Sequence, residues 1–121
     1  MSIGASAEDY LETILLLSRK TGAVRSIDIV GEMGFSKPSV SVAMKKLRDD
    51  KLIEMAPDGY ITLTERGEET AARVYDRHST IYDWLTANGV SDSQAALDAC
   101  RMEHIISEET FIVIKKLAEK Q

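Results

Sequence analysis

The sequence predicts a mainly α-helical protein with one small β-hairpin. Apolar residues recur at helical spacing through most of the 121 positions. One segment, residues 52–63, instead alternates apolar and polar residues on both sides of a Pro-Asp-Gly turn. Ser, Thr and Gly stand where the periodic segments begin or end, as helix caps do. With 44% hydrophobic residues, a chain of this length can bury one modest core or two small ones.

The first two helices are predicted at residues 6–20 and 27–33. Ser6 opens the first segment and Ser26 precedes the second, so we expect both to be N-caps that accept hydrogen bonds from the first N–H groups. Gly34 follows the second helix, at a position where positive φ is favoured. A short turn therefore joins the second helix to a third.

The third helix is predicted at residues 37–48, with Ser36 as N-cap. Pro38 lies in its first turn, where the missing N–H costs nothing. The inward stripe is apolar and consists of Val40, Ala43, Met44 and Leu47. The remaining face is small, hydroxylated and basic, and includes Ser39, Ser41, Val42, Lys45, Lys46 and Arg48. The hairpin follows, with strands at 52–55 and 60–63.

Two helices joined by a short turn and followed by a hairpin form a winged helix-turn-helix, a module that reads DNA with its second helix. The net charge of −5 argues against nucleic acid, because phosphates are bound by Lys and Arg. The charge is uneven, however, since residues 36–51 hold five basic and two acidic side chains. We therefore predict double-stranded DNA as a partner. The alternative is a helix-turn-helix module that does not bind DNA. In that case these basic residues would only form a solvent-exposed face.

After Thr64 the pattern is helical throughout, with helices expected at about 65–88, after Ser91, and at 108–119 after Ser107. So short a bundle cannot cover all of its apolar residues internally, which predicts a homodimer interface. The apolar residues concerned are Ile81, Trp84, Leu85, Ile105, Ile106, Phe111, Ile112, Ile114 and Leu117.

Cys100, Glu103 and His104 stand at i, i+3 and i+4 of the middle helix of this bundle, so they share one face. A thiolate, a carboxylate and an imidazole together suit a divalent transition metal better than Ca²⁺ or Mg²⁺. In the alternative, Cys100 packs as a small apolar residue and the other two are ordinary surface groups.

Asp9 and Glu12 form a second pair of acids, at i and i+3 of the first helix. Two carboxylates at this spacing repel each other, so either they point to water or a cation lies between them. His78 stands in the long helix that follows the hairpin. A single histidine there is either a packing residue or a further ligand.

The chain resembles the diphtheria toxin repressor and manganese transport regulator family of metal-dependent repressors. The matching segments are Asp9-Tyr10-Leu11-Glu12, Ser36-Lys37-Pro38-Ser39-Val40-Ser41, Arg77-His78, and Asp98 to His104 with the Ile105-Ile106-Ser107-Glu108-Glu109 that follows. The resemblance implies a winged helix-turn-helix DNA-binding domain at 1–64 and a helical metal-binding and dimerisation domain at 65–121.

The resemblance also implies the site residues. It makes Asp9, Glu12, His78, Cys100, Glu103 and His104 the metal ligands. With the basic face described above, it makes Ser36, Lys37, Pro38, Ser39, Ser41, Val42, Lys45, Lys46 and Arg48 the DNA-binding residues. The function implied is repression of metal-homeostasis genes by a dimer that binds palindromic operators when it holds metal.

The match combines two branches of the family. Asp9 and Glu12 resemble the manganese branch, whereas Cys100 resembles the iron branch. Fe²⁺ or Mn²⁺ is therefore expected, with Co²⁺, Ni²⁺ or Zn²⁺ as substitutes in vitro. The number of ions in each subunit stays open. The chain ends after the dimerisation helices, so we expect a short form without the SH3-like domain of longer members.

Composition favours the cytoplasm. One Cys excludes an internal disulfide, and residues 1–6 lack the features of a signal peptide. No apolar stretch is as long as a membrane span, so a membrane is not expected as a partner. No substrate cleft is suggested, so an organic substrate is not expected either.

The sequence is compatible with two other functions. A winged-helix regulator of this kind could sense a small organic ligand or a protein partner, with a vestigial metal site. An enzyme could use Glu103 as a base on metal-bound water. No substrate cleft or oxyanion loop is suggested by the sequence, so we predict that the chain is not an enzyme.

Overall fold

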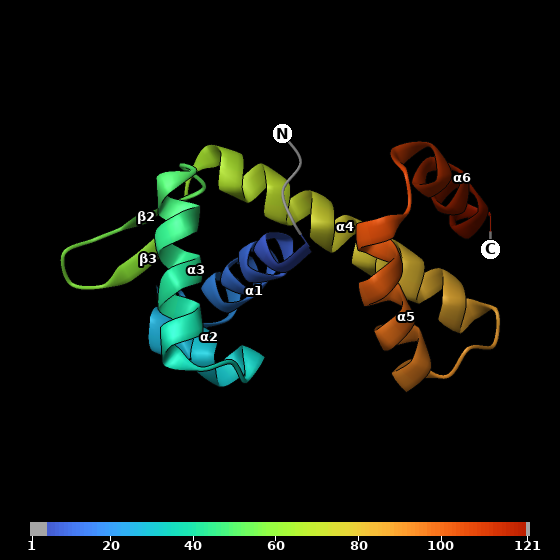
Figure 1. Ribbon diagram of the computed structural model, residues 1–121. Helices are drawn as coiled ribbons and strands as arrows, with labels where there is room; N and C mark the ends of the chain where they lie inside the picture. The colour runs from blue at the N-terminus through green and yellow to red at the C-terminus, as the bar shows by residue number, and fades with distance from the viewer. Residues whose placement is uncertain (1–4, 121) are drawn as a thin grey trace. The chain divides into compact units, whose positions relative to one another are not determined.

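The computed structural model describes residues 5–120 and is mainly helical, with one three-stranded antiparallel sheet (Figure 1). The predicted fold class is confirmed. The elements are α1 (Ala5–Thr21), β1 (Val24–Arg25), α2 (Ser26–Met33), α3 (Lys37–Asp49), β2 (Ile53–Met55), β3 (Tyr60–Leu63), α4 (Glu65–Ala87), α5 (Asp92–Ile105) and α6 (Glu108–Glu119). They form two compact units, Met1–Ala72 and Arg73–Gln121, and the boundary falls within α4.

The sheet of the first unit has the strand order β1-β3-β2. The hairpin β2–β3 was predicted, and its register pairs Ile53 with Leu63. The third strand was not predicted, because β1 has two residues and its pairing of Val24 with Ile61 joins distant parts of the chain. The wing is therefore anchored to the segment between α1 and α2.

One apolar core holds α1, α2, α3 and the sheet together. Its fully buried members include Leu11 and Ile14 of α1, Ile29 of α2 and Ile53 of β2. The inward stripe predicted for α3 is confirmed, since Val40, Met44 and Leu47 are buried and Ala43 packs partly buried against them. This packing leaves the other face of α3 to solvent.

Caps fix where several elements begin. Ser36 accepts a hydrogen bond from the N–H of Ser39 and caps α3 as predicted, and Thr64 accepts one from Gly67 at the start of α4. Two predicted caps were wrong. Helix α1 already includes Ala5, so Ser6 lies inside it. The N-cap of α2 is Arg25, whose backbone N–H donates to Asp28, because the strand β1 runs directly into the helix.

Gly67 places the first turn of α4 directly on the hairpin. A Cβ atom there would lie 1.9 Å from the carbonyl oxygen of Leu52, so no larger residue fits without movement of the backbone. Nearby, the hydroxyl of Thr64 donates to the carbonyl of Lys51 at 2.8 Å. The beginning of α4 is thereby fixed to the hairpin of the first unit.

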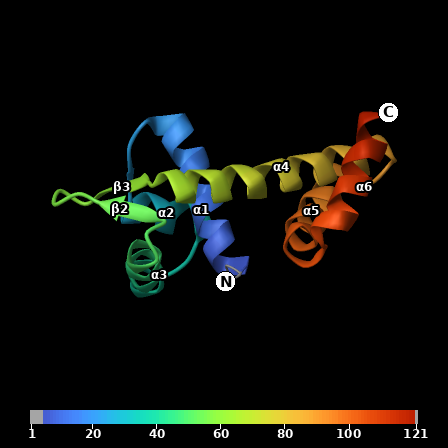
Figure 2. The ribbon, with the colours of Figure 1, turned by 90° about the horizontal axis from the view of Figure 1, so that it is seen from above.

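The second unit consists of the later part of α4 with α5 and α6, which lie beside it in both views (Figure 2). Ser91 and Ser107 cap α5 and α6 as predicted. The core includes Ile81, Phe111 and Ile114. These three residues were expected to help form the dimer surface and are buried instead. The large apolar residues exposed on α5 and α6 are Leu97, Ile105, Ile112, Val113 and Leu117.

Candidate metal centre and DNA-binding face

The last two turns of α5 carry three potential metal ligands. Cys100, Glu103 and His104 share one face, and one ligand atom from each lies within 4.8 Å of the others. Cys100 is exposed, Glu103 is buried and His104 is partly buried. The helix ends one residue after His104, so the cluster lies at the C-terminal end of α5. The predicted helical spacing therefore does bring these three groups together.

Glu103 is an unusual buried acid. Its side chain is 1% exposed, with Oε2 3.1 Å from Nδ1 of His78 and Oε1 3.3 Å from Nε2 of His104. Neither contact has hydrogen-bond geometry, and within the described residues neither carboxylate oxygen receives a hydrogen bond. Burying a carboxylate without compensating hydrogen-bond donors costs roughly several kcal/mol of folding free energy. The position therefore calls for positive charge.

The donor chemistry fits a divalent transition metal. Two imidazole nitrogens, a carboxylate and a nearby thiol are the ligand types that such ions take. A cation among these groups would supply the charge that Glu103 lacks. His78 contributes an imidazole from α4, and the packing of α4 against α5 brings this group to Glu103. The His78 side chain is 30% exposed.

The other two predicted ligands, Asp9 and Glu12, lie on α1 in the first unit. Both are partly buried, and they flank Leu11, which faces the core. Their i, i+3 spacing puts both carboxylates on the same side of α1. They complete the six predicted ligands.

The outward face of α3 has the predicted character. All nine residues predicted to bind DNA are exposed, namely Ser36, Lys37, Pro38, Ser39, Ser41, Val42, Lys45, Lys46 and Arg48. Val42 is 71% exposed, so its apolar side chain is accessible on this face. At the start of the helix, the hydroxyl of Ser36 donates to that of Ser39 at 2.9 Å. The face offers hydroxyls, positive charge and one apolar group.

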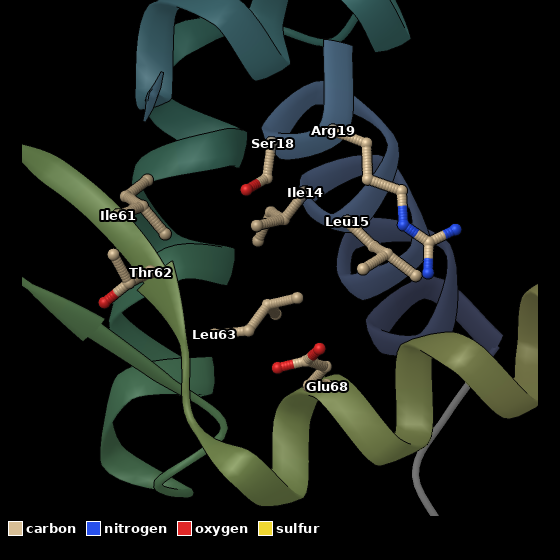
Figure 3. Close-up of a pocket in the computed structure, with 8 residues that line it drawn as sticks. All are labelled: Ile14, Leu15, Ser18, Arg19, Ile61, Thr62, Leu63 and Glu68. Carbon is tan, nitrogen blue, oxygen red and sulfur yellow. The ribbon is translucent and has the colours of Figure 1, made fainter. Parts of the chain in front are cut away.

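A separate cavity of about 290 Å³ lies in the first unit, among α1, β3 and the start of α4 (Figure 3). Buried Ile14, Leu15 and Ile61 form its apolar wall, and Arg19 and Glu68 stand at its exposed rim. It shares no residue with the predicted ligands or with the outward face of α3. The cavity therefore plays no part in the site described above.

Sequence reasoning missed one residue beside the cluster. Arg77 was noted as part of a resemblance and given no role, yet its guanidinium reaches the end of α5 and the start of α6. Contacts over such sequence separations leave no local pattern. The adjacent His78 was the available signal, because a helix that presents a ligand usually needs support at that point.

Comparisons with known proteins agree with this geometry. Residues 2–61 match the model of the N-terminal DNA-binding domain of iron-dependent repressors, and residues 64–120 match that of their metal-binding and dimerisation domain. Fold, donor cluster and helix face thus define a metal-dependent, DNA-binding transcriptional repressor. The chain belongs to the iron-dependent repressor family. This is a family of transcriptional regulators and not of enzymes.

Relatives come from bacteria and archaea. The transcriptional regulator MntR of Escherichia coli O6:H1 is 37% identical over 113 residues, which cover 93% of this chain and 73% of that protein. A helix-turn-helix regulator of Methanocaldococcus jannaschii, itself uncharacterized, is 32% identical over 117 residues, covering 95% of this chain and 94% of that protein.

Among solved structures, the manganese regulator SloR superposes with a TM-score of 0.84 at 25% identity, and this chain spans 56% of its length. Within residues 5–120, no helix has the length and apolar character needed to cross a membrane.

Proposed function

We propose that this chain represses metal-homeostasis genes by binding palindromic operators as a homodimer when it holds Fe²⁺ or Mn²⁺. The observation that carries the proposal is the buried Glu103 carboxylate, which faces two imidazoles without a hydrogen bond to either oxygen. Residues 1–64 would read DNA and residues 65–121 would bind metal and dimerise. We place the protein in the cytoplasm, with neither a membrane nor an organic substrate as partner.

The proposed ligands are Asp9, Glu12, His78, Cys100, Glu103 and His104. Three carboxylates favour Mn²⁺ or Fe²⁺, and the thiol of Cys100 favours Fe²⁺ or a later metal. Similar structures include a manganese-dependent repressor in complex with manganese. This likeness and the carboxylates support Mn²⁺, and the thiol supports Fe²⁺. We expect Co²⁺, Ni²⁺ and Zn²⁺ to substitute in vitro.

The distribution of these ligands supports a mechanism of control. Asp9 and Glu12 belong to the DNA-binding half, and the other four belong to the dimerisation half. When both sets hold one ion, the DNA-binding half is restrained by the dimer. In a two-fold dimer the α3 helices must reach successive major grooves about 34 Å apart. A restraint that favours this spacing raises operator affinity by linkage.

The outward face of α3 would make the DNA contacts. Lys37, Lys45, Lys46 and Arg48 are proposed to bind phosphates, which supply affinity without sequence information. Ser36, Pro38, Ser39 and Val42 are proposed to lie at base edges, where Val42 suits a thymine methyl group. Ser41 is proposed to contact DNA from the same face. The exposure of all nine residues supports this assignment.

The test is DNA binding by anaerobically purified protein, followed by fluorescence anisotropy. The probes are the DNA upstream of the chain's own gene and a random duplex of equal length. Saturating Mn²⁺ or Fe²⁺ should raise affinity for the upstream DNA about 5- to 150-fold over the chelated protein, the usual range of coupling between sites. Equal affinity with and without chelator would overturn the proposal.

A further inference from the structure

Arg77 joins three parts of the second unit. Its Nη1 donates to the backbone carbonyl oxygens of Glu103 at 3.1 Å and Ile106 at 3.3 Å. Its Nη2 donates to Oε2 of Glu108 at 2.6 Å, at the beginning of α6. The Arg77 side chain is 15% exposed, so its two bonds to carbonyl oxygens are partly buried, whereas the Glu108 carboxylate is 63% exposed. One guanidinium thus holds the end of α5 against both α4 and α6.

The two carbonyl groups are ones that the helix itself leaves without partners. The last turn of a helix has C=O groups with no N–H four residues further on, and α5 ends at Ile105. A cation at this end also interacts favourably with the helix dipole. Arg77 therefore completes α5 at the turn from which Glu103 and His104 project.

Arginine is required for this geometry. Its planar guanidinium offers several N–H donors in a fixed arrangement, whereas a lysine ammonium is a single compact charge. The Arg77 guanidinium also lies 5.2 Å from the centre of the Phe111 ring, which restricts its plane. Lysine at this position would keep the charge and lose the simultaneous contacts to α5 and α6.

We propose that Arg77 is the positioning residue of the metal ligands, a role that rests on the function proposed above. Arg77 and His78 are neighbours on α4. Arg77 bonds the backbone of Glu103, and His78 faces the carboxylate of the same residue at 3.1 Å. The backbone bond thereby sets the distance between the two ligands. Arg77 touches no ligand atom, so it acts through the place and orientation of Glu103.

The test compares four variants with the wild-type chain. Arg77→Met removes the charge and all three hydrogen bonds, and Arg77→Lys keeps the charge. Glu108→Gln weakens only the arm to α6. Lys115→Met is the matched control, because Lys115 forms a neighbouring α4–α6 ion pair, with Asp76 at 3.0 Å, that involves no residue of α5. The probe is Co²⁺ alone, read by calorimetric titration and by its visible absorption spectrum.

Arg77→Met should weaken Co²⁺ binding about 10- to 100-fold, as the loss of groups that orient metal ligands usually does. Its Co²⁺ spectrum should also change, because the ligands would no longer hold their geometry. Arg77→Lys should fall between Arg77→Met and wild type. Glu108→Gln and Lys115→Met should keep the wild-type spectrum and affinity.

The outcomes separate this proposal from the one it rests on. If wild type binds Co²⁺ and both Arg77 variants match it in affinity and spectrum, the positioning role is overturned and the metal site stands. If Lys115→Met changes the spectrum as Arg77→Met does, general loosening of the unit explains both and the role is again overturned. If wild type binds no Co²⁺, both proposals fall. Should Arg77→Met not fold by circular dichroism, the spectrum of Arg77→Lys decides.

Discussion

The outward face of α3 and the end of α5 show two different ways of building a functional surface. On α3 every proposed DNA contact is exposed, and the helix is held by a Ser36 cap and a buried stripe on its other side. On α5 the central group, Glu103, is buried and lacks hydrogen bonds. On α3 the residues proposed to function are therefore different from those that stabilise the fold. On α5 the residue proposed to function, Glu103, itself destabilises the fold.

The difference has a physical cause. Contacts to phosphates and base edges need side chains that reach outward, and such side chains contribute little to folding. A metal ligand needs a fixed position, which burial gives. Burial of a carboxylate costs free energy until a cation arrives. Variants of α3 should consequently lose binding alone, whereas variants of Glu103 should change binding and stability in opposite directions.

The largest effect is expected for Glu103→Gln. Groups that merely orient ligands cost about 10- to 100-fold in metal affinity, so loss of this ligand should cost at least about 100-fold. The metal-free protein should at the same time gain about 1–3 kcal/mol in free energy of unfolding, because a buried charge without donors is removed. Titration with Mn²⁺ and urea unfolding with chelator measure the two quantities.

Glu109→Gln is the matched control for this variant. Glu109 is exposed in the first turn of α6, so the same change of charge should leave the stability within about 0.5 kcal/mol of wild type. If Glu103→Gln destabilises the metal-free protein while Glu109→Gln does not, the opposition between function and stability at α5 is refuted.

A smaller effect is expected for Cys100→Ser. The thiol is exposed, so its loss should leave stability unchanged and reduce Co²⁺ affinity about tenfold, or about 1.4 kcal/mol. A thiolate bound to Co²⁺ gives a charge-transfer band in the near ultraviolet, which the serine variant should lack. A wild-type spectrum without this band would remove Cys100 from the ligand set.

Much of the fold was predictable because its signals are local. Ser36, Ser91 and Ser107 cap their helices within a few residues of sequence, and the spacing of Cys100, Glu103 and His104 fixes their common face. Arg25 was missed as a cap because its position depends on the strand β1, which forms only when Val24 meets Ile61. Pairing between distant segments leaves no local pattern.

The identity of the candidate site residues was predictable from the sequence, but their burial and their contacts were not. Helical spacing shows that Glu103 lies beside Cys100 and His104, but it does not show which of them α4 covers. The burial of Glu103 depends on packing against another helix, and so does the contact to His78. Burial of Phe111 and Ile114, which were expected at the dimer surface, was missed for the same reason.

On α3, Val42→Ala should reduce discrimination between upstream and random DNA by about 1 kcal/mol, the lower end of the range for a base contact. The side chain is exposed, so the free energy of unfolding should stay within about 0.5 kcal/mol of wild type. Anisotropy titrations with both duplexes, with metal saturating, give the discrimination. Leu97→Ala, an equally exposed apolar truncation on α5, is the control and should leave it unchanged.

The smallest effect is expected for Lys46→Ala, and it should differ in kind from that of Val42→Ala. A phosphate contact carries no sequence information, so affinity for both duplexes should fall by the same few-fold factor. The slope of log K against log salt should decrease in magnitude by about one unit, because one fewer counterion is released.

Lys116→Ala makes the same change of charge on the exposed side of α6 and should keep the wild-type slope. An equal decrease in both variants would mean that net charge, and not the face of α3, sets the salt dependence. A loss confined to the upstream DNA would instead place Lys46 at a base edge.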